Sequence, residues 1–274
     1  MRAAGKVFIV TGAGNGIGRH VAQRLIACGA TVAGADVDEA GLAQTAALVE
    51  DPSRFTAHVL DVSDRAAVAA FPATVLAAHG HIDGLFNIAG IAQEFELVGE
   101  ISDERIDTLF QVNFFGTVWL TRAVLPHLRE RPAAVIMNTS SLSAMVSVPG
   151  SAIYGATKAA VASFGYGLSQ DLRKSSAVTV TTVFPGAVWT DIVRKSALAL
   201  GTSEKLARSF SAKPEVAARR MVDATLDGRV RVVIGKDARV YDVVGRLSTR
   251  LADKMSYGQL RRFVYKPANN TADR

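Results

Sequence analysis

The stretch Val7-Phe-Ile-Val-Thr11, followed directly by Gly12-Ala-Gly-Asn-Gly-Ile-Gly18, decides the fold of this chain. The run of apolar and β-branched residues indicates a buried strand, and the glycines indicate a tight turn into a helix. A strand that leads through a glycine loop into a helix is typical of the first unit of a parallel α/β sheet. We therefore expect the rest of the chain to repeat this strand–helix unit.

Six further apolar segments follow at the spacing of such units. The expected strands are 31–35, 55–60, 82–86, 133–139, 178–184 and 230–234, and the clearest expected helices are 102–131, 151–174 and 214–226. The unbroken alternation predicts an α/β fold: a single doubly wound Rossmann-type domain with a mostly parallel seven-stranded sheet and helices on both faces. We expect this domain to span residues 1–235 and a basic helical extension to span 236–274.

Composition and charge exclude several classes of protein. Hydrophobic residues make up 49% and charged residues 20% of the 274, which is enough to build a large core. The net charge of +6 is concentrated in residues 236–274, where nine Lys or Arg oppose four Asp. These cations lack interleaved aromatic residues and a helix-turn-helix pattern, so we expect no nucleic-acid partner.

The single cysteine, Cys28, excludes an internal disulfide and a cysteine-rich metal site. The histidines show no metal-ligand spacing, so we expect no metal. The first strand runs straight into the glycine loop, which disfavours a cleavable export signal, and no apolar run is long enough to span a membrane. We expect a cytoplasmic protein.

The glycine loop predicts a site for a dinucleotide pyrophosphate. The positive end of the following helix and its free N–H groups attract phosphate, and glycines allow close approach. The spacing Gly-x-x-x-Gly-x-Gly is weak evidence alone, because a structural turn can show it too. Its place after the first strand favours cofactor binding, and we assign to that site Gly12, Asn15, Gly16, Ile17 and Gly18.

Asp36, which closes the second expected strand, indicates which dinucleotide binds. A carboxylate there accepts hydrogen bonds from the adenosine ribose hydroxyls and repels a 2′-phosphate. Position 15 is Asn and position 37 is Val, so neither neighbour supplies a cation for a phosphate. We therefore expect NAD; the alternative is that Asp36 only begins the turn Asp36-Val-Asp38.

Tyr154 and Lys158 are four residues apart in an expected helix, so both side chains leave the same face. The pKa of a tyrosine is near 10 in water, and a close lysine cation would lower it into a range suited to general acid–base catalysis. We expect such a shift here. The pair alone also fits an ordinary helix surface.

The ordered combination of motifs resembles the short-chain dehydrogenase/reductase family over roughly residues 5–235. The motifs are Thr11-Gly-Ala-Gly-Asn-Gly-Ile-Gly18, Asp61-Val62, Asn87-Ile-Ala-Gly90, Asn113, Ser140-Ser141, Tyr154-x-x-x-Lys158 and Pro185-Gly-Ala-Val-Trp-Thr190. Ile88 stands where the family commonly has asparagine, and Ala144 where it often has glycine. No reacting group is lost, so the resemblance implies an NAD(H)-dependent enzyme that interconverts a secondary alcohol and a ketone.

The resemblance also implies roles for single residues. Tyr154 would transfer the proton, Lys158 would hold the nicotinamide ribose and tune the tyrosine, and Ser141, or alternatively Ser140, would polarise the substrate oxygen. Asn113 would tie Lys158 to a proton-relaying water. Besides the glycine loop, Asp36, Tyr154 and Lys158, the cofactor would contact Asp61, Val62, Asn87, Ala89, Gly90, Pro185, Gly186, Val188 and Thr190.

The family further implies a homotetramer or homodimer built through the expected helix 102–131 and the helix bearing Tyr154. The candidate contacts are Phe114, Phe115, Val118, Phe164 and Leu168. In the family, the segment after Thr190 folds over the substrate, and its apolar residues at 191–201 favour a lipophilic one. The competing interpretation is a non-catalytic NAD-sensing or scaffold protein of the same fold.

The tail needs its own account. Its apolar residues recur at helical spacing with cations among them: Val240, Val243, Val244, Leu247, Leu251 and Met255. Two interpretations stay open. The helix either packs on its own domain or a partner subunit, or it lies on an anionic membrane surface.

Overall fold

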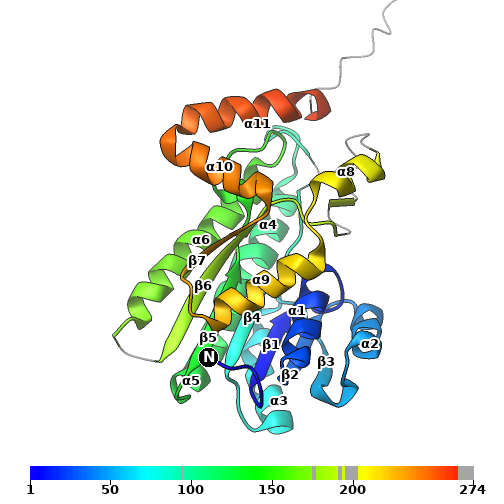
Figure 1. The fold of residues 1–274 in the computed structure, drawn as a ribbon, viewed down its shortest axis with the longest axis vertical. Helices are drawn as coiled ribbons and strands as arrows, with labels where there is room; N and C mark the ends of the chain where they lie inside the picture. Colours follow the sequence, from blue (N-terminus) through cyan, green and yellow to red (C-terminus); the bar gives the residue numbers. More distant parts are fainter. Residues whose placement is uncertain (94, 175–176, 191–192, 195–202, 265–274) are drawn as a thin grey trace, which may run out of the picture.

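A parallel sheet forms the centre of the computed structural model, which describes residues 1–274 apart from 94, 175–176, 191–192, 195–202 and 265–274 (Figure 1). Its seven strands lie in the order β3-β2-β1-β4-β5-β6-β7, and every neighbouring pair is parallel. Their bounds are β1 Val7–Thr11, β2 Thr31–Asp36, β3 Phe55–Val59, β4 Gly84–Asn87, β5 Ala134–Thr139, β6 Val178–Pro185 and β7 Arg231–Ile234. The predicted doubly wound fold is confirmed, with a fully parallel sheet.

Helices cover both faces of the sheet and bury separate hydrophobic clusters (Figure 1). One face carries α1 (Gly16–Ala27), α2 (Glu39–Leu48) and α9 (Pro214–Leu226). The other carries α3 (Arg65–His79), α5 (Gly116–Arg129) and α6 (Ala152–Leu172). Strands buried on both faces explain why the sheet segments are apolar throughout rather than alternating.

The helix expected over 102–131 is interrupted. α4 (Asp103–Phe110) passes into a π-helical turn at Gln111–Phe115, and only then does α5 begin. A π-helical turn adds a residue to the local repeat, which a helical apolar pattern does not reveal. The turn contains Asn113, which is fully buried. The expected helical stretch is thus confirmed over residues 103–129, with a π-helical turn that the pattern did not predict at the residue with a proposed role.

The tail forms two helices and not the single one that its apolar spacing predicts. α10 (Lys236–Leu247) stops before Ser248, whose extended backbone (φ −161°, ψ 105°) breaks the helix. α11 (Thr249–Val264) then runs back over α10 (Figure 1). The hairpin packs on its own domain through a small hydrophobic cluster that includes Tyr241, Ala252 and Val146. A short helix, α8 (Glu204–Phe210), precedes α9.

Candidate active site

A cleft of about 610 Å³ opens at the carboxyl ends of the strands. Loops at this edge of a parallel sheet converge, so residues distant in sequence can line one cavity. Three of the four proposed catalytic residues, Ser141, Tyr154 and Lys158, lie on its wall. The proposed cofactor residues on the wall are Gly12, Asn15, Gly16, Ile17, Gly18, Asp36, Asp61, Val62, Ala89, Gly90, Pro185, Gly186, Val188 and Thr190.

Two proposed site residues lie behind the wall instead. Asn87 is buried beneath it, where its Nδ2 donates to Thr121 Oγ1 at 3.1 Å and to Asn138 Oδ1 at 2.9 Å. Asn113 accepts from Ile91 N at 2.8 Å through Oδ1, and its Nδ2 donates to Ile91 O and Thr157 Oγ1. Asn113 therefore fixes the backbone of the wall at Ile91, whereas Asn87 ties two buried side chains together beneath it.

Glycines allow the backbone of the loop to pack closely against its neighbours and to stay bare of side chains. A Cβ on Gly18 would overlap Gly12 O, so the loop can close only around glycine. A Cβ on Gly90 would lie 2.9 Å from Asn113 Oδ1 and 3.2 Å from Lys158 Nζ. Gly16 faces Thr190 across the cleft, where a Cβ would lie 3.3 Å from Thr190 Cγ2. This bare backbone at the start of α1 fits the pyrophosphate of a dinucleotide.

The Asp36 carboxylate stands at the far end of the cleft and is fixed by backbone donors. Gly14 N donates to Oδ2 at 2.8 Å, and Asp38 N donates to Oδ1 at 3.1 Å. A cation near this loop, Arg19, donates to Gly14 O, to Gln44 Oε1 and to Thr45 Oγ1. Protein acceptors thus already engage the Arg19 guanidinium, which fits the expectation of a site without a phosphate partner.

The Tyr154 hydroxyl and Ser141 face each other across the cleft. Burial raises the pKa of Tyr154, and a hydrogen bond with the Ser141 hydroxyl acts in the opposite direction. Ser141 Oγ is itself oriented by Ser143 N, 3.1 Å away. The alternative serine, Ser140, is buried and donates to Lys158 O at 2.7 Å, so its hydroxyl is engaged by the backbone of α6.

Lys158 lies behind Tyr154 with its Nζ 5.8 Å from the phenol ring centroid. The side chain is only 4% exposed, and its Nζ donates to Thr139 O at 3.1 Å. Burial lowers the pKa of Lys158 to about 8, so the ammonium loses its charge as the pH rises through that value. The expected lowering of the Tyr154 pKa was wrong, because burial disfavours the charged form of each group.

Comparison with known proteins decides the family. A model of the short chain dehydrogenase family matches residues 6–200, which is more than half of the chain. The chain belongs to the short-chain dehydrogenase family. It is an oxidoreductase by that membership, as the expected resemblance implied.

Relatives match this short-chain dehydrogenase over most of its length. The protein named oxidoreductase SadH of Mycobacterium tuberculosis is 36% identical over 251 residues, 89% of this chain and 91% of that one. Levodione reductase of Leifsonia aquatica is 30% identical over 198 residues, 71% of this chain and 74% of that one. The crystal structure of a short-chain dehydrogenase from Burkholderia phymatum in complex with NAD has a TM-score of 0.78 at 27% identity. That match covers 97% of this chain and 99% of that chain, so it reaches into the tail.

Two further residues shape the site of this short-chain dehydrogenase, and the sequence pattern does not reveal them. Asp237, in the first turn of α10, accepts from Ala187 N at 2.8 Å, and its carboxylate fills the space beside Gly186. Gln93 is buried and bonds to the first turn of α6. Asp237 lies 50 residues from its partner Ala187 in the sequence, and Gln93 lies 60 residues from its partner Ile153. No local spacing rule links such distant partners.

Residues 191–192 and 195–202, which carry most of the expected substrate-covering segment, lie outside the described residues. Val193 is described and lines the cleft. The apolar side chains of Ile91, in the loop after β4, and of Val112, in the π-helical turn, also line the cleft. Within the described part of the chain, no group of three or more His, Cys, Asp or Glu is placed to hold a metal ion.

Proposed function

We propose that this protein is an NAD(H)-dependent dehydrogenase or reductase that interconverts a secondary alcohol and a ketone. One observation carries the proposal: the Tyr154 hydroxyl, Ser141 and Lys158 meet on the wall of the cleft that begins at the glycine loop. A dinucleotide that lies from Asp36 along the glycine loop would bring its nicotinamide towards these three side chains. The family membership and an NAD-bound relative support the same cofactor.

The residues divide the work of alcohol oxidation. When bound, NAD⁺ accepts the hydride that leaves the carbinol carbon. Ser141 holds the substrate oxygen by a hydrogen bond, and Tyr154 takes the hydroxyl proton as the carbonyl forms. Lys158 keeps positive charge beside the phenol, and Asn113 holds the backbone at Ile91, next to the Gly90 that adjoins Lys158 Nζ. Ketone reduction reverses each transfer.

We propose a lipophilic substrate, because apolar side chains at Ile91, Val112 and Val193 line the cleft. One relative is named for a cyclic alcohol, as a 2,5-dichloro-2,5-cyclohexadiene-1,4-diol dehydrogenase, and another is named levodione reductase. Incubation with NAD and a panel of acyclic and cyclic secondary alcohols, followed by NADH absorbance, tests the function. Tight NAD binding with no turnover of any alcohol or ketone would instead favour the NAD-sensing or scaffold protein.

We propose that the protein assembles as a homodimer or homotetramer through an aromatic surface on α5, α6 and the π-helical turn. Phe115 stacks on Trp119 with ring centroids 5.6 Å apart, and Phe114 meets Phe164 edge-on at 6.5 Å. Partly exposed aromatic clusters favour protein interfaces. Leu168, expected in this surface, packs in the core instead at 8% exposure.

Light scattering at micromolar concentration should therefore give two or four times the chain mass of 29.0 kDa. Phe115→Glu with Trp119→Glu should shift the protein to monomers, because each places a charge in an apolar contact. The matched control is Val59→Glu, an exposed residue of the edge strand β3. A monomeric unmodified protein would refute the assembly.

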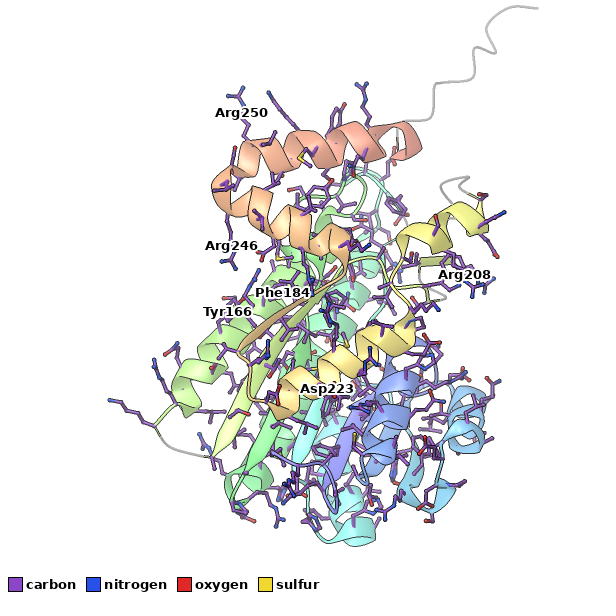
Figure 2. The ribbon with its side chains drawn as sticks, in the orientation of Figure 1. Tyr166, Phe184, Arg208, Asp223, Arg246 and Arg250 are labelled. Carbon is purple, nitrogen blue, oxygen red and sulfur yellow. The ribbon has the colours of Figure 1, made fainter. Side chains whose placement is uncertain are left out.

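The tail keeps an outward face that packing on its own domain leaves uncovered. Val240, Val243, Leu247 and Leu251 are each at least half exposed, and Leu247 reaches 82%. Cations precede three of them in sequence at positions 239, 246 and 250. Arg250 points away from the body of the molecule (Figure 2), whereas Arg246 pairs with Asp242 at 3.0 Å. None of the described helices is long and apolar enough to cross a bilayer. We propose a cytoplasmic enzyme whose tail rests on an anionic membrane surface, where each cation adds roughly 1 kcal/mol.

Flotation with phosphatidylserine vesicles at low salt tests this contact. Val243→Asp with Leu247→Asp should abolish binding, and Val59→Asp, which adds charge on the remote edge strand, should not. These point variants are preferable to deletion of the tail, because deletion also removes the Asp237 carboxylate, which accepts a hydrogen bond from Ala187 N. Failure of the unmodified protein to float with anionic vesicles would leave packing on its own domain as the role of the tail.

A further inference from the structure

The helix that carries Tyr154 begins without a capping side chain of its own. The hydroxyl of Ser151, which precedes α6, makes no capping hydrogen bond, and no acidic residue lies in the first turn. Gly155 N donates to Ser151 O at 2.9 Å, which starts the helical hydrogen-bond pattern. N–H groups before that point have no partner within a helix. The backbone N–H groups of Ile153 and Tyr154 therefore need an acceptor from elsewhere.

Gln93 supplies this acceptor. Its Oε1 accepts from Ile153 N and from Tyr154 N, each at 3.1 Å, and its Nε2 donates to Glu96 O at 2.9 Å. The side chain is 3% exposed. Because one end only accepts and the other only donates, these partners fix the orientation of the amide. A single buried amide thus holds the backbone of the proposed acid–base residue.

The loop that carries Gln93 is also held by contacts outside α6. Asn113 bonds to both Ile91 N and Ile91 O, at 2.8 and 3.0 Å. The Arg105 guanidinium donates to Ala92 O at 2.6 Å. The two residues before Gln93 are therefore tied to α4 and the π-helical turn, so the amide is a fixed point against which α6 is placed.

We propose that Gln93 is a positioning residue that caps α6 and keeps the Tyr154 hydroxyl within hydrogen-bond reach of Ser141. The proposal rests on the proposed role of Tyr154 as the acid–base. A displacement of about 1 Å at a reacting group can reduce catalysis by about 10²-fold. Loss of the cap should therefore reduce turnover, whereas the glycine loop and Asp36, which would hold the cofactor, make no contact with this amide.

Two variants separate the acceptor from the volume of the side chain. Gln93→Met keeps the length and removes the acceptor, and kcat should fall roughly 10- to 100-fold. Gln93→Glu keeps an oxygen for Ile153 N and Tyr154 N but loses the donor to Glu96 O, so its kcat should lie clearly above that of Gln93→Met. Turnover is expressed per NADH-binding site, measured by fluorescence titration, so that unfolded protein does not contribute. Gln23→Met is the matched control, because that side chain donates only to Leu48 O at the surface.

The pH profile of alcohol oxidation distinguishes positioning from simple support of the fold. The hydrogen bond from Ser141 lowers the pKa of Tyr154, so its loss raises that pKa. Oxidation needs the deprotonated phenol, so the profile of kcat for Gln93→Met should move to higher pH and return with Gln93→Glu. The proposal fails if the profile does not move, if both variants lose activity alike, or if Gln93→Met yields no NADH-binding protein. If Tyr154→Phe remains active, the proposed role of Tyr154 is wrong. If Tyr154→Phe is inactive but Gln93→Met has the kcat of the unmodified protein, only the proposed role of Gln93 is wrong.

Discussion

Replacement of Tyr154 by phenylalanine should reduce kcat by about 10²- to 10⁴-fold, the range that general acid–base catalysis contributes. The ring stays in place, but the phenol oxygen that meets Ser141, and that we propose takes the substrate proton, is gone. The affinity for NADH should change little, because the bare backbone of the glycine loop and the Asp36 carboxylate remain. Steady-state turnover together with fluorescence titration of NADH measures both quantities.

Tyr166→Phe is the matched control for this variant. Tyr166 belongs to the same helix, but its ring stacks on Phe184 outside the cleft, with centroids 6.4 Å apart (Figure 2). Its loss of a hydroxyl should leave kcat within about threefold of the unmodified protein. Activity of Tyr154→Phe within tenfold of the unmodified enzyme would contradict the assignment of Tyr154 as the acid–base.

Asp36→Asn combined with Val37→Arg should shift the preference from NAD towards NADP by about 10- to 100-fold in kcat/KM. The Asn keeps an oxygen for Gly14 N while removing the charge that repels a 2′-phosphate. Val37 is 63% exposed beside the cleft, so an arginine there can reach the phosphate through a charge-assisted hydrogen bond of about 1.5–3 kcal/mol. The ratio of kcat/KM for the two cofactors measures the shift.

The two single variants divide the effect into its parts. Asp36→Asn removes only the charge that repels the 2′-phosphate. Val37→Arg adds only a cation, and in that variant the Asp36 carboxylate remains to pair with the new arginine. Each alone should therefore give a smaller shift than the combination. If the unmodified protein already uses NADP with the higher kcat/KM, the interpretation of Asp36 is wrong and the carboxylate serves only the turn that begins there.

The sequence predicts the sheet well because each strand is defined by its own residues. The first strand and the helix at 214–226 begin and end where the pattern places them. The sequence pattern misses two helix irregularities, the π-helical turn at Gln111–Phe115 and the break at Ser248. Apolar spacing reports which face is buried but not whether the backbone hydrogen bonds continue, so neither interruption could be seen.

The site is predictable where the chemistry lies in short motifs and not where it depends on distant partners. The glycine loop, Asp36 and the Tyr154–Lys158 pair could be found by spacing. Gln93 could not, because its role depends on a helix end 60 residues away. The pKa of Tyr154 was predicted in the wrong direction because a helical spacing gives proximity to Lys158 but says nothing about the loss of water around both groups.

The hydrogen bond from Ala187 to Asp237 has a consequence for how the enzyme is made. A ribosome releases the residues proposed for proton transfer and for pyrophosphate binding well before it reaches Asp237. Until α10 has emerged, the loop at Gly186 lacks the carboxylate that fills the space beside it. A nascent or prematurely terminated chain that ends at residue 235 thus carries all of the proposed reacting groups. It lacks the Asp237 carboxylate that bonds to the loop at Ala187. Helix α10 thus completes a site whose motifs all precede it in the sequence.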